Sequence, residues 1–400
     1  MKKDLIPGLA IKSNSKIVLV VFDGLGGLPR NPGEKTELET AYTPNLDTLA
    51  IRSVCGLADP ISMGITPGSG PAHMSLFGYD PVQYEIGRGI LSALGVDFTL
   101  RHSDVAARAN FAQVDAHGNV IDRRAGRIST EKNQELCERL SQIKIPGVEI
   151  FVRTEKDHRA AIIFRGAGLS GRLSDTDPQK VGVLPLKVEP LEEEARHTAE
   201  IVNRFVDQAR EILSCEERAN MILLRGFDKY EALPSYAERY RLNAAAIANY
   251  PMYRGVARLL GMTILPTGDT IQSEFETLAQ HYQDYDFFFL HIKKTDSNGE
   301  DGNFEGKVKI IEEADRSFPI LTNLQPDVIV VTGDHSTPAV LKAHSWHPNP
   351  VLLYSKYCRP DSVKTFSESE CRQGGLGRFP AVNLMPLMMA NALKLNKYGA

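Results

Sequence analysis

The segment Ile17-Val-Leu-Val-Val-Phe22, followed at once by Asp23 and Gly24, decides the fold. Its six apolar residues do not alternate with polar ones, which is typical of a strand buried on both faces in a parallel sheet covered by helices. The carboxylate that follows would lie at the carboxyl edge of the sheet, where open α/β sheets bind their ligands. This segment therefore predicts an α/β protein with a polar site after an early buried strand.

Similar apolar runs, with helical patterns between them, occur along the rest of the chain. The runs are Phe287–Leu290, Val328–Val331, Val351–Tyr354, Ile162–Phe164 and Met221–Leu224. Apolar residues recur at helical spacing over residues 195–212 and 304–314, and Thr43-Pro44 is typical of a helix start. Alternating strands and helices predict a mostly parallel sheet flanked by helices.

Composition limits the classes of partner. The 400 residues include 46 basic and 50 acidic ones, and the net charge of −4 provides no overall field for binding nucleic acid or an anionic membrane. No apolar run approaches the roughly 18 residues that a membrane span needs, and no export signal precedes Ile17. Five cysteines without a CxxC pair indicate reduced thiols. We therefore expect a cytoplasmic protein that acts on a small molecule.

Three of the predicted strands end in acidic or histidine residues. Asp23 follows the first, His291 and then Asp296 follow the second, and Asp334-His335 follows the third. One strand that ends in aspartate is ordinary turn chemistry, but three parallel strands would bring these side chains to one edge. The pattern predicts a shared site.

The residues near these strand ends are suitable metal ligands. Asp334 and His335 offer an oxygen and a nitrogen, His344 follows nine residues later, and Asp296 and Glu300 are four apart. The last pair alone would be typical of solvated charge. His347, three residues after His344, is an alternative ligand to Glu300.

A candidate nucleophile lies in the segment Gly68-Ser69-Gly-Pro71-Ala-His73, a small-residue turn that leads into a predicted helix with Pro71 at its first position. Ser69 would then lie at the helix N-terminus, where amide groups and the helix dipole favour a phosphate or a serine oxyanion. A serine hydroxyl needs a base or a metal to become a good nucleophile, and a two-metal site can supply that activation.

These residues together resemble the alkaline phosphatase superfamily and, more narrowly, the archaeal-type 2,3-bisphosphoglycerate-independent phosphoglycerate mutases. The similarity extends into the middle of the chain and so covers nearly all of it. The segments that carry it are Asp23-Gly, Thr43-Pro-Asn-Leu-Asp, Gly68-Ser69-Gly-Pro-Ala-His, Asp122-Arg-Arg-Ala-Gly-Arg, Leu173-Ser-Asp-Thr-Asp-Pro, Tyr250-Pro-Met-Tyr-Arg-Gly, Lys294-Thr-Asp296, Thr332-Gly-Asp334-His335 and His344-Ser.

The resemblance implies a phosphatase-like core from residues 1–80 and 256–400, with an inserted α/β lid domain at 81–255. It implies that Ser69 becomes phosphorylated and that two divalent metal ions are bound. The implied ligands are Asp23, Ser69, Asp334 and His335 for one ion, and Asp296, Glu300 and His344 for the other. The family pattern has histidine where this chain has Glu300. Because the added carboxylate is a hard ligand, we expect Mn²⁺ or Mg²⁺.

The implied reaction interconverts 3-phosphoglycerate and 2-phosphoglycerate, in glycolysis and gluconeogenesis, without 2,3-bisphosphoglycerate. Guanidinium groups bind phosphate and carboxylate, so we expect Arg123, Arg159 and Arg225 of the lid to bind substrate and Asp122 to carry protons. Two other hypotheses stay open: a phosphomonoesterase or mutase of another phosphorylated metabolite, and an inactive metal-binding member of the family. A homo-oligomer is neither predicted nor excluded.

Overall fold

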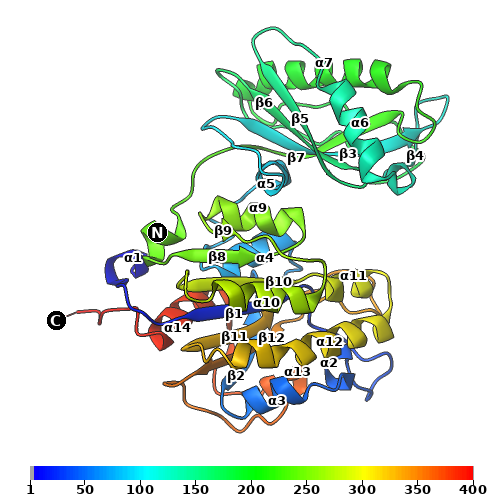
Figure 1. Ribbon diagram of the computed structural model, residues 1–400. Coiled ribbons are helices and arrows are strands. Elements are labelled where there is room, and N and C mark those ends of the chain that lie inside the picture. Colours follow the sequence, from blue (N-terminus) through cyan, green and yellow to red (C-terminus); the bar gives the residue numbers. More distant parts are fainter. Residues whose placement is uncertain (1–3, 400) are drawn as a thin grey trace. The chain divides into compact units, whose positions relative to one another are not determined.

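The computed structural model describes residues 4–399 and contains two compact units (Figure 1). The first unit combines the chain up to Glu85 with the chain from Pro234 onward, and the second is Ile86–Leu233. The sequence had placed these divisions at 80/81 and 255/256. The second division comes earlier because strand β8 (Ala244–Ile247) pairs in parallel with β10 (Phe287–Ile292) in the sheet of the first unit.

The first unit is built on an eight-stranded sheet in the order β13-β2-β12-β11-β1-β10-β8-β9. Five of the neighbouring pairs are parallel, and the two pairs that involve β12 are antiparallel. Its remaining strands are β1 (Ile17–Phe22), β2 (Val54–Asp59), β9 (Thr263–Ile264), β11 (Val328–Gly333), β12 (Asn349–Ser355) and β13 (Gly377–Pro380). Its helices are α1 (Ile6–Leu9), α2 (Glu37–Thr40), α3 (Pro44–Ala50), α4 (Ser69–Leu76), α8 (Tyr236–Tyr240), α9 (Pro251–Leu259), α10 (Ile271–His281), α11 (Lys294–Glu300), α12 (Phe304–Thr322), α13 (Glu368–Cys371) and α14 (Leu384–Asn391).

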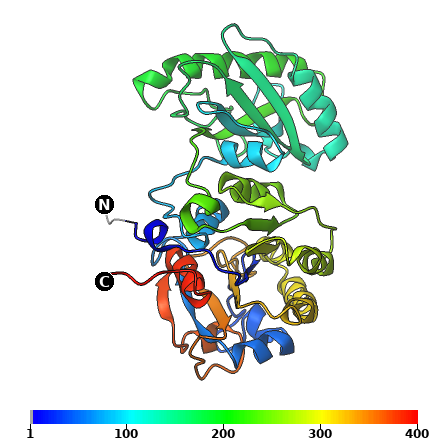
Figure 2. The ribbon, with the colours of Figure 1, turned by 60° about the vertical axis from the view of Figure 1, so that its left-hand side comes forward.

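Helices cover both faces of this sheet, which explains the uninterrupted apolar runs. Val18, Val20 and Phe22 of β1 belong to one core with residues of α3, α10 and α12. On the opposite face, Phe289 of β10 packs edge-on against Phe77, at the end of α4, with ring centroids 4.9 Å apart. Figure 2 shows the same layers from another side. The predicted α/β fold with a mostly parallel sheet is confirmed for this unit.

The second unit has a five-stranded antiparallel sheet, in which β3 (Val105–Val114) pairs with β4 (Val120–Asp122), β6 (Arg159–Arg165) and β7 (Met221–Lys229). Strand β5 (Glu149–Lys156) extends it beside β6. Helices α6 (Thr130–Leu140) and α7 (Arg196–Leu213) share its hydrophobic core, and α5 (Arg88–Gly95) packs on β3, β6 and β7. The runs in β6, β7 and β12 were expected in parallel pairs. That expectation was wrong because an apolar run reports burial and not strand direction.

Local details also differ from the patterns. Helix α3 begins at Pro44 as predicted, but Thr43 makes no side-chain cap. Helix α4 begins at Ser69, so Pro71 is its third residue and not its first. Among residues 4–399, no helix is both long enough and apolar enough to cross a bilayer.

Candidate active site

The candidate site lies at the carboxyl edge of the large sheet, where β1, β10 and β11 end side by side. The parallel register aligns Phe22 with Ile292 on one neighbour and with Gly333 on the other. Asp23 and Asp334 therefore leave adjacent strands at the same level. This is the convergence that the strand endings predicted.

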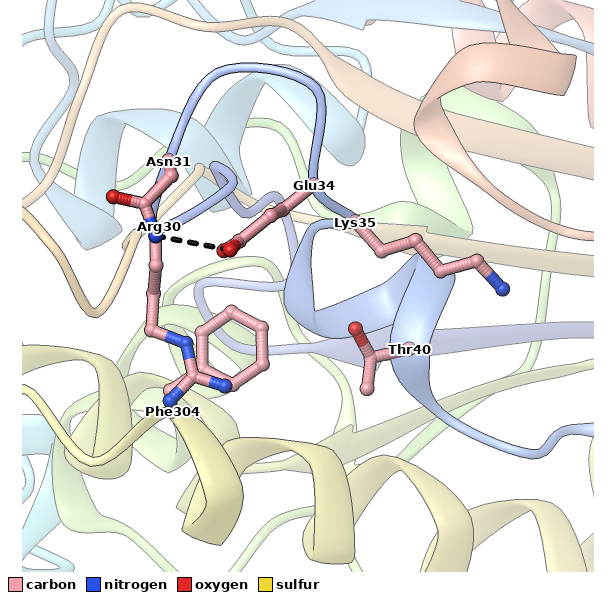
Figure 3. Close-up of a pocket in the computed structure, with 6 residues that line it drawn as sticks. All are labelled: Arg30, Asn31, Glu34, Lys35, Thr40 and Phe304. Carbon is pink, nitrogen blue, oxygen red and sulfur yellow. Dashed lines mark hydrogen bonds between the residues drawn. The ribbon is translucent and has the colours of Figure 1, made fainter.

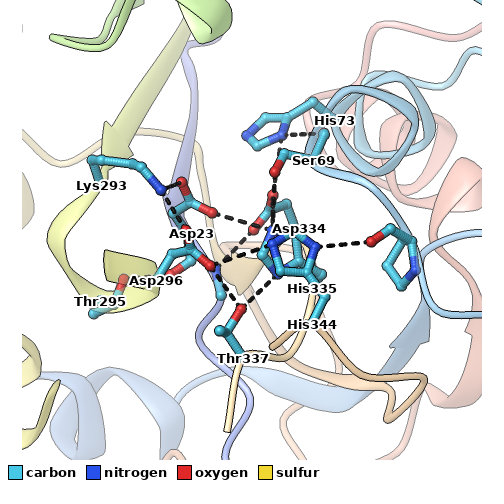
Figure 4. Close-up of polar contacts among 12 residues, drawn as sticks. Asp23, Ser69, His73, Lys293, Thr295, Asp296, Asp334, His335, Thr337 and His344 are labelled. Carbon is cyan, nitrogen blue, oxygen red and sulfur yellow. Dashed lines mark hydrogen bonds and ion pairs between the residues drawn. The ribbon is translucent and has the colours of Figure 1, made fainter. Parts of the chain in front are cut away.

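The first cluster of polar side chains brings together Asp23, Asp334, His335 and Ser69 (Figure 4). His335 Nε2 lies 3.3 Å from Asp23 Oδ1, 3.2 Å from Asp334 Oδ2 and 3.2 Å from Ser69 Oγ. Both carboxylates and the imidazole are completely buried. Four potential ligand atoms thus surround one point at the edge of the sheet.

The surroundings of two carboxylate oxygens show whether a cation fits this cluster. Asp23 Oδ1 and Asp334 Oδ2 are buried and have no hydrogen-bond partner among the described residues. A buried charge without a partner is costly, and such groups are ordinarily paired or coordinate a metal. The donor set of two carboxylates, one imidazole and one hydroxyl suits a divalent cation.

The ionisation of the two aspartates differs. Complete burial alone would raise the pKa of Asp23, but the positive charge of Lys293 outweighs it, so this pKa lies well below its ordinary value. Burial raises the pKa of Asp334 to about 8, and the negative charges of Asp23 and Asp296 contribute to the rise. Like charges this close resist simultaneous ionisation unless a cation offsets them.

The proton of His335 is positioned by Thr337. Thr337 Oγ1 lies 2.8 Å from Asp296 Oδ1 and 3.0 Å from His335 Nδ1. Because an ionised carboxylate only accepts hydrogen bonds, the hydroxyl donates to Asp296 and accepts from His335 Nδ1–H. His335 Nε2 consequently presents a lone pair, which is the form that binds a metal.

A second cluster consists of Asp296, His335 and His344, whose ligand atoms all lie within 4.8 Å of one another. His344 Nδ1 donates to Pro67 O at 2.9 Å, so its Nε2 faces Asp296 Oδ1, 3.6 Å away. The rings of His335 and His344 stack with centroids 3.6 Å apart. His335 is therefore common to both clusters.

Glu300 lies at the edge of this second cluster. Its side chain is 57% exposed, and its Oε1 is 4.0 Å from His344 Nε2. His347, the alternative, contacts Ser345 Oγ with its Nδ1 at 3.0 Å and does not belong to either cluster. The third potential ligand close to Asp296 and His344 is thus His335, which also belongs to the first cluster. Residue spacing could not predict that one histidine belongs to both clusters.

Ser69 begins α4, where the first backbone N–H groups have no partner within the helix. The imidazole of His73, one turn later, donates from Nδ1 to Ser69 O at 2.8 Å. Burial lowers the pKa of His73 to about 4, so this ring is neutral. The Ser69 hydroxyl is thereby held at a helix N-terminus beside the first cluster.

Sequence reasoning missed Lys293 and Tyr253. Lys293 Nζ lies 2.9 Å from Asp23 Oδ2 and 2.5 Å from Asp296 Oδ2, and so bridges carboxylates of both clusters. The Tyr253 hydroxyl donates to Asp23 Oδ2. Lys293 follows β10 directly, so its position after a buried strand was an available signal. Tyr253 lies on α9, within the segment Tyr250-Pro-Met-Tyr-Arg-Gly that carries the family resemblance, so that segment was its signal.

The second unit contains the other four predicted site residues. Asp122 Oδ1 and Oδ2 accept hydrogen bonds from the backbone of Arg124 and Gly126 at 2.8 and 2.6 Å. Arg123 binds Asp177 through both Nε and Nη2, at 2.8 and 2.7 Å. The structure therefore shows Asp122 and Arg123 already engaged within their own unit.

Arg225 and Arg159 share one face of the second sheet with Arg108, which sequence reasoning also missed. Arg108 of β3 lies opposite Arg225 of β7, and Asn110, two residues along β3, lies opposite Arg159 of β6. Side chains two apart on a strand point to the same face. Burial lowers the pKa of Arg108 to about 10; the charge of Glu155 opposes this change, and the charges of neighbouring arginines add to it. The charges of Arg108 and Arg159 also act on the carboxylate of Glu155, so basic residues gather here around one acidic residue.

A separate polar hollow of about 410 Å³ lies near the start of α12 and contains none of the predicted site residues (Figure 3). Arg30 stacks 4.3 Å from the ring centroid of Phe304 and pairs with Glu305 at 2.6 Å. Its guanidinium is thus already engaged, and the hollow offers no comparable chemistry.

Known proteins are similar to this chain in both sequence and structure. A family model described as 2,3-bisphosphoglycerate-independent phosphoglycerate mutase matches residues 50–219. A Thermus thermophilus protein named "Probable 2,3-bisphosphoglycerate-independent phosphoglycerate mutase" is 51% identical over 405 residues, covering 99% of this chain and 100% of the relative. A Thermotoga maritima protein of the same name is 50% identical over 401 residues, covering 100% and 99%.

Among solved structures, one described as a cofactor-independent phosphoglycerate mutase from Thermoplasma acidophilum is 32% identical. It has a TM-score of 0.69 and covers 94% of this chain and 100% of its own. A protein from Pyrococcus horikoshii is 30% identical with a TM-score of 0.85, covering 97% and 100%. The chain therefore belongs to the 2,3-bisphosphoglycerate-independent phosphoglycerate mutase family.

Proposed function

We propose that this protein is an isomerase that interconverts 3-phosphoglycerate and 2-phosphoglycerate through a phosphoserine at Ser69, in cytoplasmic glycolysis and gluconeogenesis. The observation that carries the proposal is the position of Ser69 Oγ, which is 3.2 Å from the imidazole shared by the two ligand clusters. An activated hydroxyl beside buried cation ligands is what phosphoryl transfer to a serine requires.

The proposed cofactors are two divalent cations, Mn²⁺ or Mg²⁺. Asp23, Ser69, Asp334 and His335 would hold one ion, and Asp296, His344 and Glu300 the other. When bound, the ions would offset the charge of the phosphoryl oxygens and lower the pKa of the Ser69 hydroxyl. The carboxylate-rich ligand set favours hard cations over Zn²⁺.

Ser69 Oγ attacks phosphorus while the bond from phosphorus to the donor oxygen of glycerate breaks. The proton that Ser69 loses balances the proton that the departing glycerate oxygen gains. In the return step the other glycerate hydroxyl gives up its proton, and its oxygen attacks the phosphorus of the phosphoserine. The bond from phosphorus to Ser69 Oγ breaks, and Oγ regains a proton. Asp122 is the proposed carrier of the glycerate protons, and Asp122→Asn should slow both directions equally.

The second unit has the proposed task of retaining glycerate between the two steps. Arg159 and Arg225 share a half-buried basic face with Arg108, and guanidinium groups bind carboxylates with two parallel hydrogen bonds. Arg123 would contribute indirectly, because it holds Asp177, whose carboxylate lies 3.8 Å from Arg225.

Phosphorus NMR of the purified protein with 3-phosphoglycerate and Mn²⁺ or Mg²⁺, without bisphosphoglycerate, tests the proposal. Accumulating 2-phosphoglycerate supports it, free phosphate indicates a phosphomonoesterase, and no change with either metal indicates an inactive family member. The matched control is Ser69→Ala. We expect the turnover rate of this variant to fall at least a thousandfold. Its free energy of unfolding should stay within about 0.5 kcal/mol of the parent's, because the small half-buried hydroxyl makes few packing contacts.

A further inference from the structure

A lysine is completely buried beneath the candidate active site. Lys307, in the first turn of α12, has no exposed surface. Its Nζ donates to Gly26 O and to Thr337 O, both at 3.0 Å. These acceptors belong to the loop after β1 and the loop after β11, the two loops that carry Asp23 and His335. One ammonium thus joins the two ligand-bearing loops.

Two carboxylates, one on the buried Glu37 and one on the half-buried Glu368, complete this connection. Glu37 accepts from the backbone of Leu28 at 3.1 Å and of Ala339 at 2.7 Å, and its Oε1 lies 4.0 Å from Lys307 Nζ. Glu368 accepts from Gly27 N at 2.9 Å. Each loop is therefore held by hydrogen bonds to a buried charge, and the positive charge of Lys307 offsets the negative charge of Glu37 without solvent.

Thr337 transmits the position of Lys307 to the ligand clusters. The same residue that offers its carbonyl to Lys307 contacts Asp296 Oδ1 and His335 Nδ1 through its hydroxyl. Moving the Thr337 backbone would move the hydroxyl that orients an oxygen ligand and an imidazole ligand together. Outer partners of metal ligands commonly change metal affinity 10- to 100-fold when removed.

We propose that Lys307 is a positioning residue that holds Thr337, and through it Asp296 and His335, in the geometry that binds the divalent cations. The proposal rests on the metal centre of the proposed function. Lysine suits this place because it has three donors on an apolar stem. Replacement by methionine would retain the stem and remove the lysine donor from both carbonyls, although Gly26 O would still accept from Thr337 N at 3.1 Å.

Mn²⁺ binding, measured by calorimetry and by the electron paramagnetic resonance of bound Mn²⁺, separates this role from a merely structural one. The variants are Lys307→Met, Thr337→Val and the double variant, with the exposed Lys309→Met of the same helix as control. Each single variant should weaken Mn²⁺ binding about 10- to 100-fold. The double variant should be no weaker than the worse single one, because both changes interrupt one connection. Thr337→Ser keeps the hydroxyl and should bind Mn²⁺ nearly as the parent does.

Several results would overturn the proposal. A folded Lys307→Met with unchanged Mn²⁺ affinity would do so, and so would losses that simply multiply in the double variant. If Lys307→Met does not fold, Thr337→Val decides, since an unchanged affinity there removes the connection to the ligands. If the parent protein binds no Mn²⁺, the proposed metal centre itself is wrong. If the parent and all variants bind Mn²⁺ equally well, the metal centre stands and only the role of Lys307 is wrong.

Discussion

One hydrogen bond determines which ring nitrogen is free in each of two candidate ligands. His344 Nδ1 bonds to Pro67 O, and His335 Nδ1 bonds to Thr337 Oγ1. Each Nδ1 donates, so each Nε2 is available to a cation. Asn349 adds a third constraint when its side-chain amide is rotated so that O and N change places, because its Nδ2 then donates to His335 O at 2.9 Å and its Oδ1 accepts from His335 N at 3.3 Å. The candidate ligands are therefore oriented by neighbours before any ion is bound, which reduces the cost of assembling the site.

Glu300 is the residue whose role is most open to test. Glu300→Gln should weaken Mn²⁺-dependent activity about tenfold, because a carboxylate near His344 Nε2 is replaced by a neutral amide. Glu300→His should shift activity towards Zn²⁺ or Co²⁺, since imidazole is a softer ligand. Metal-dependent rates of Glu300→Gln and His347→Gln, measured side by side, check this. A normal response in the first and a loss in the second would assign the ligand to His347.

Among the elements, α10 carries an ionisable group that has no part in the proposed reaction. Glu274, in its first turn, is only 5% exposed, accepts from Asn249 Nδ2 at 2.9 Å, and has no partner for its Oε2 among the described residues. Burial raises the pKa of this carboxyl to about 8. The native helix therefore holds a proton that the unfolded chain releases near 4.5.

This difference predicts how stability depends on pH. Between about pH 4.5 and 8 the native state binds more protons than the unfolded state at Glu274, so the free energy of unfolding falls as pH rises. One linked proton contributes at most about 1.4 kcal/mol per pH unit. Urea unfolding at several pH values should show a smaller decline in Glu274→Gln than in the parent. Glu276→Gln, an exposed change on the same helix, should leave the slope as it is, and equal slopes in all three proteins would refute the prediction.

At the scale of the whole molecule, each of the two units has hydrophobic core residues of its own. Units with their own cores can fold independently. The ligand clusters belong entirely to the first unit and the basic face to the second. The proposed cation binding and the proposed retention of glycerate would thus belong to different parts of the chain.

Removing residues 86–233 and joining Glu85 to Pro234 by a short linker should separate these tasks. The shortened protein should bind Mn²⁺ within a fewfold of the parent and lose mutase activity, with slow release of free phosphate as water reaches the phosphoserine. Circular dichroism and Mn²⁺ binding verify the fold, and phosphorus NMR measures the products. Efficient isomerisation by a folded, shortened protein would contradict the proposed role of the second unit.

The sequence by itself determined β1, β10 and β11, the polar residues that end them, and the family to which the chain belongs. Apolar runs and motifs are local, and strand ends converge wherever parallel strands align. The tertiary structure alone decided that His335 belongs to both clusters, that Glu300 lies at the edge of one, and that Lys307 and Thr337 connect two loops. It also decided the antiparallel pairing of the second unit and its end at Leu233. These features depend on contacts between residues far apart in the chain, about which neither periodicity nor spacing carries information.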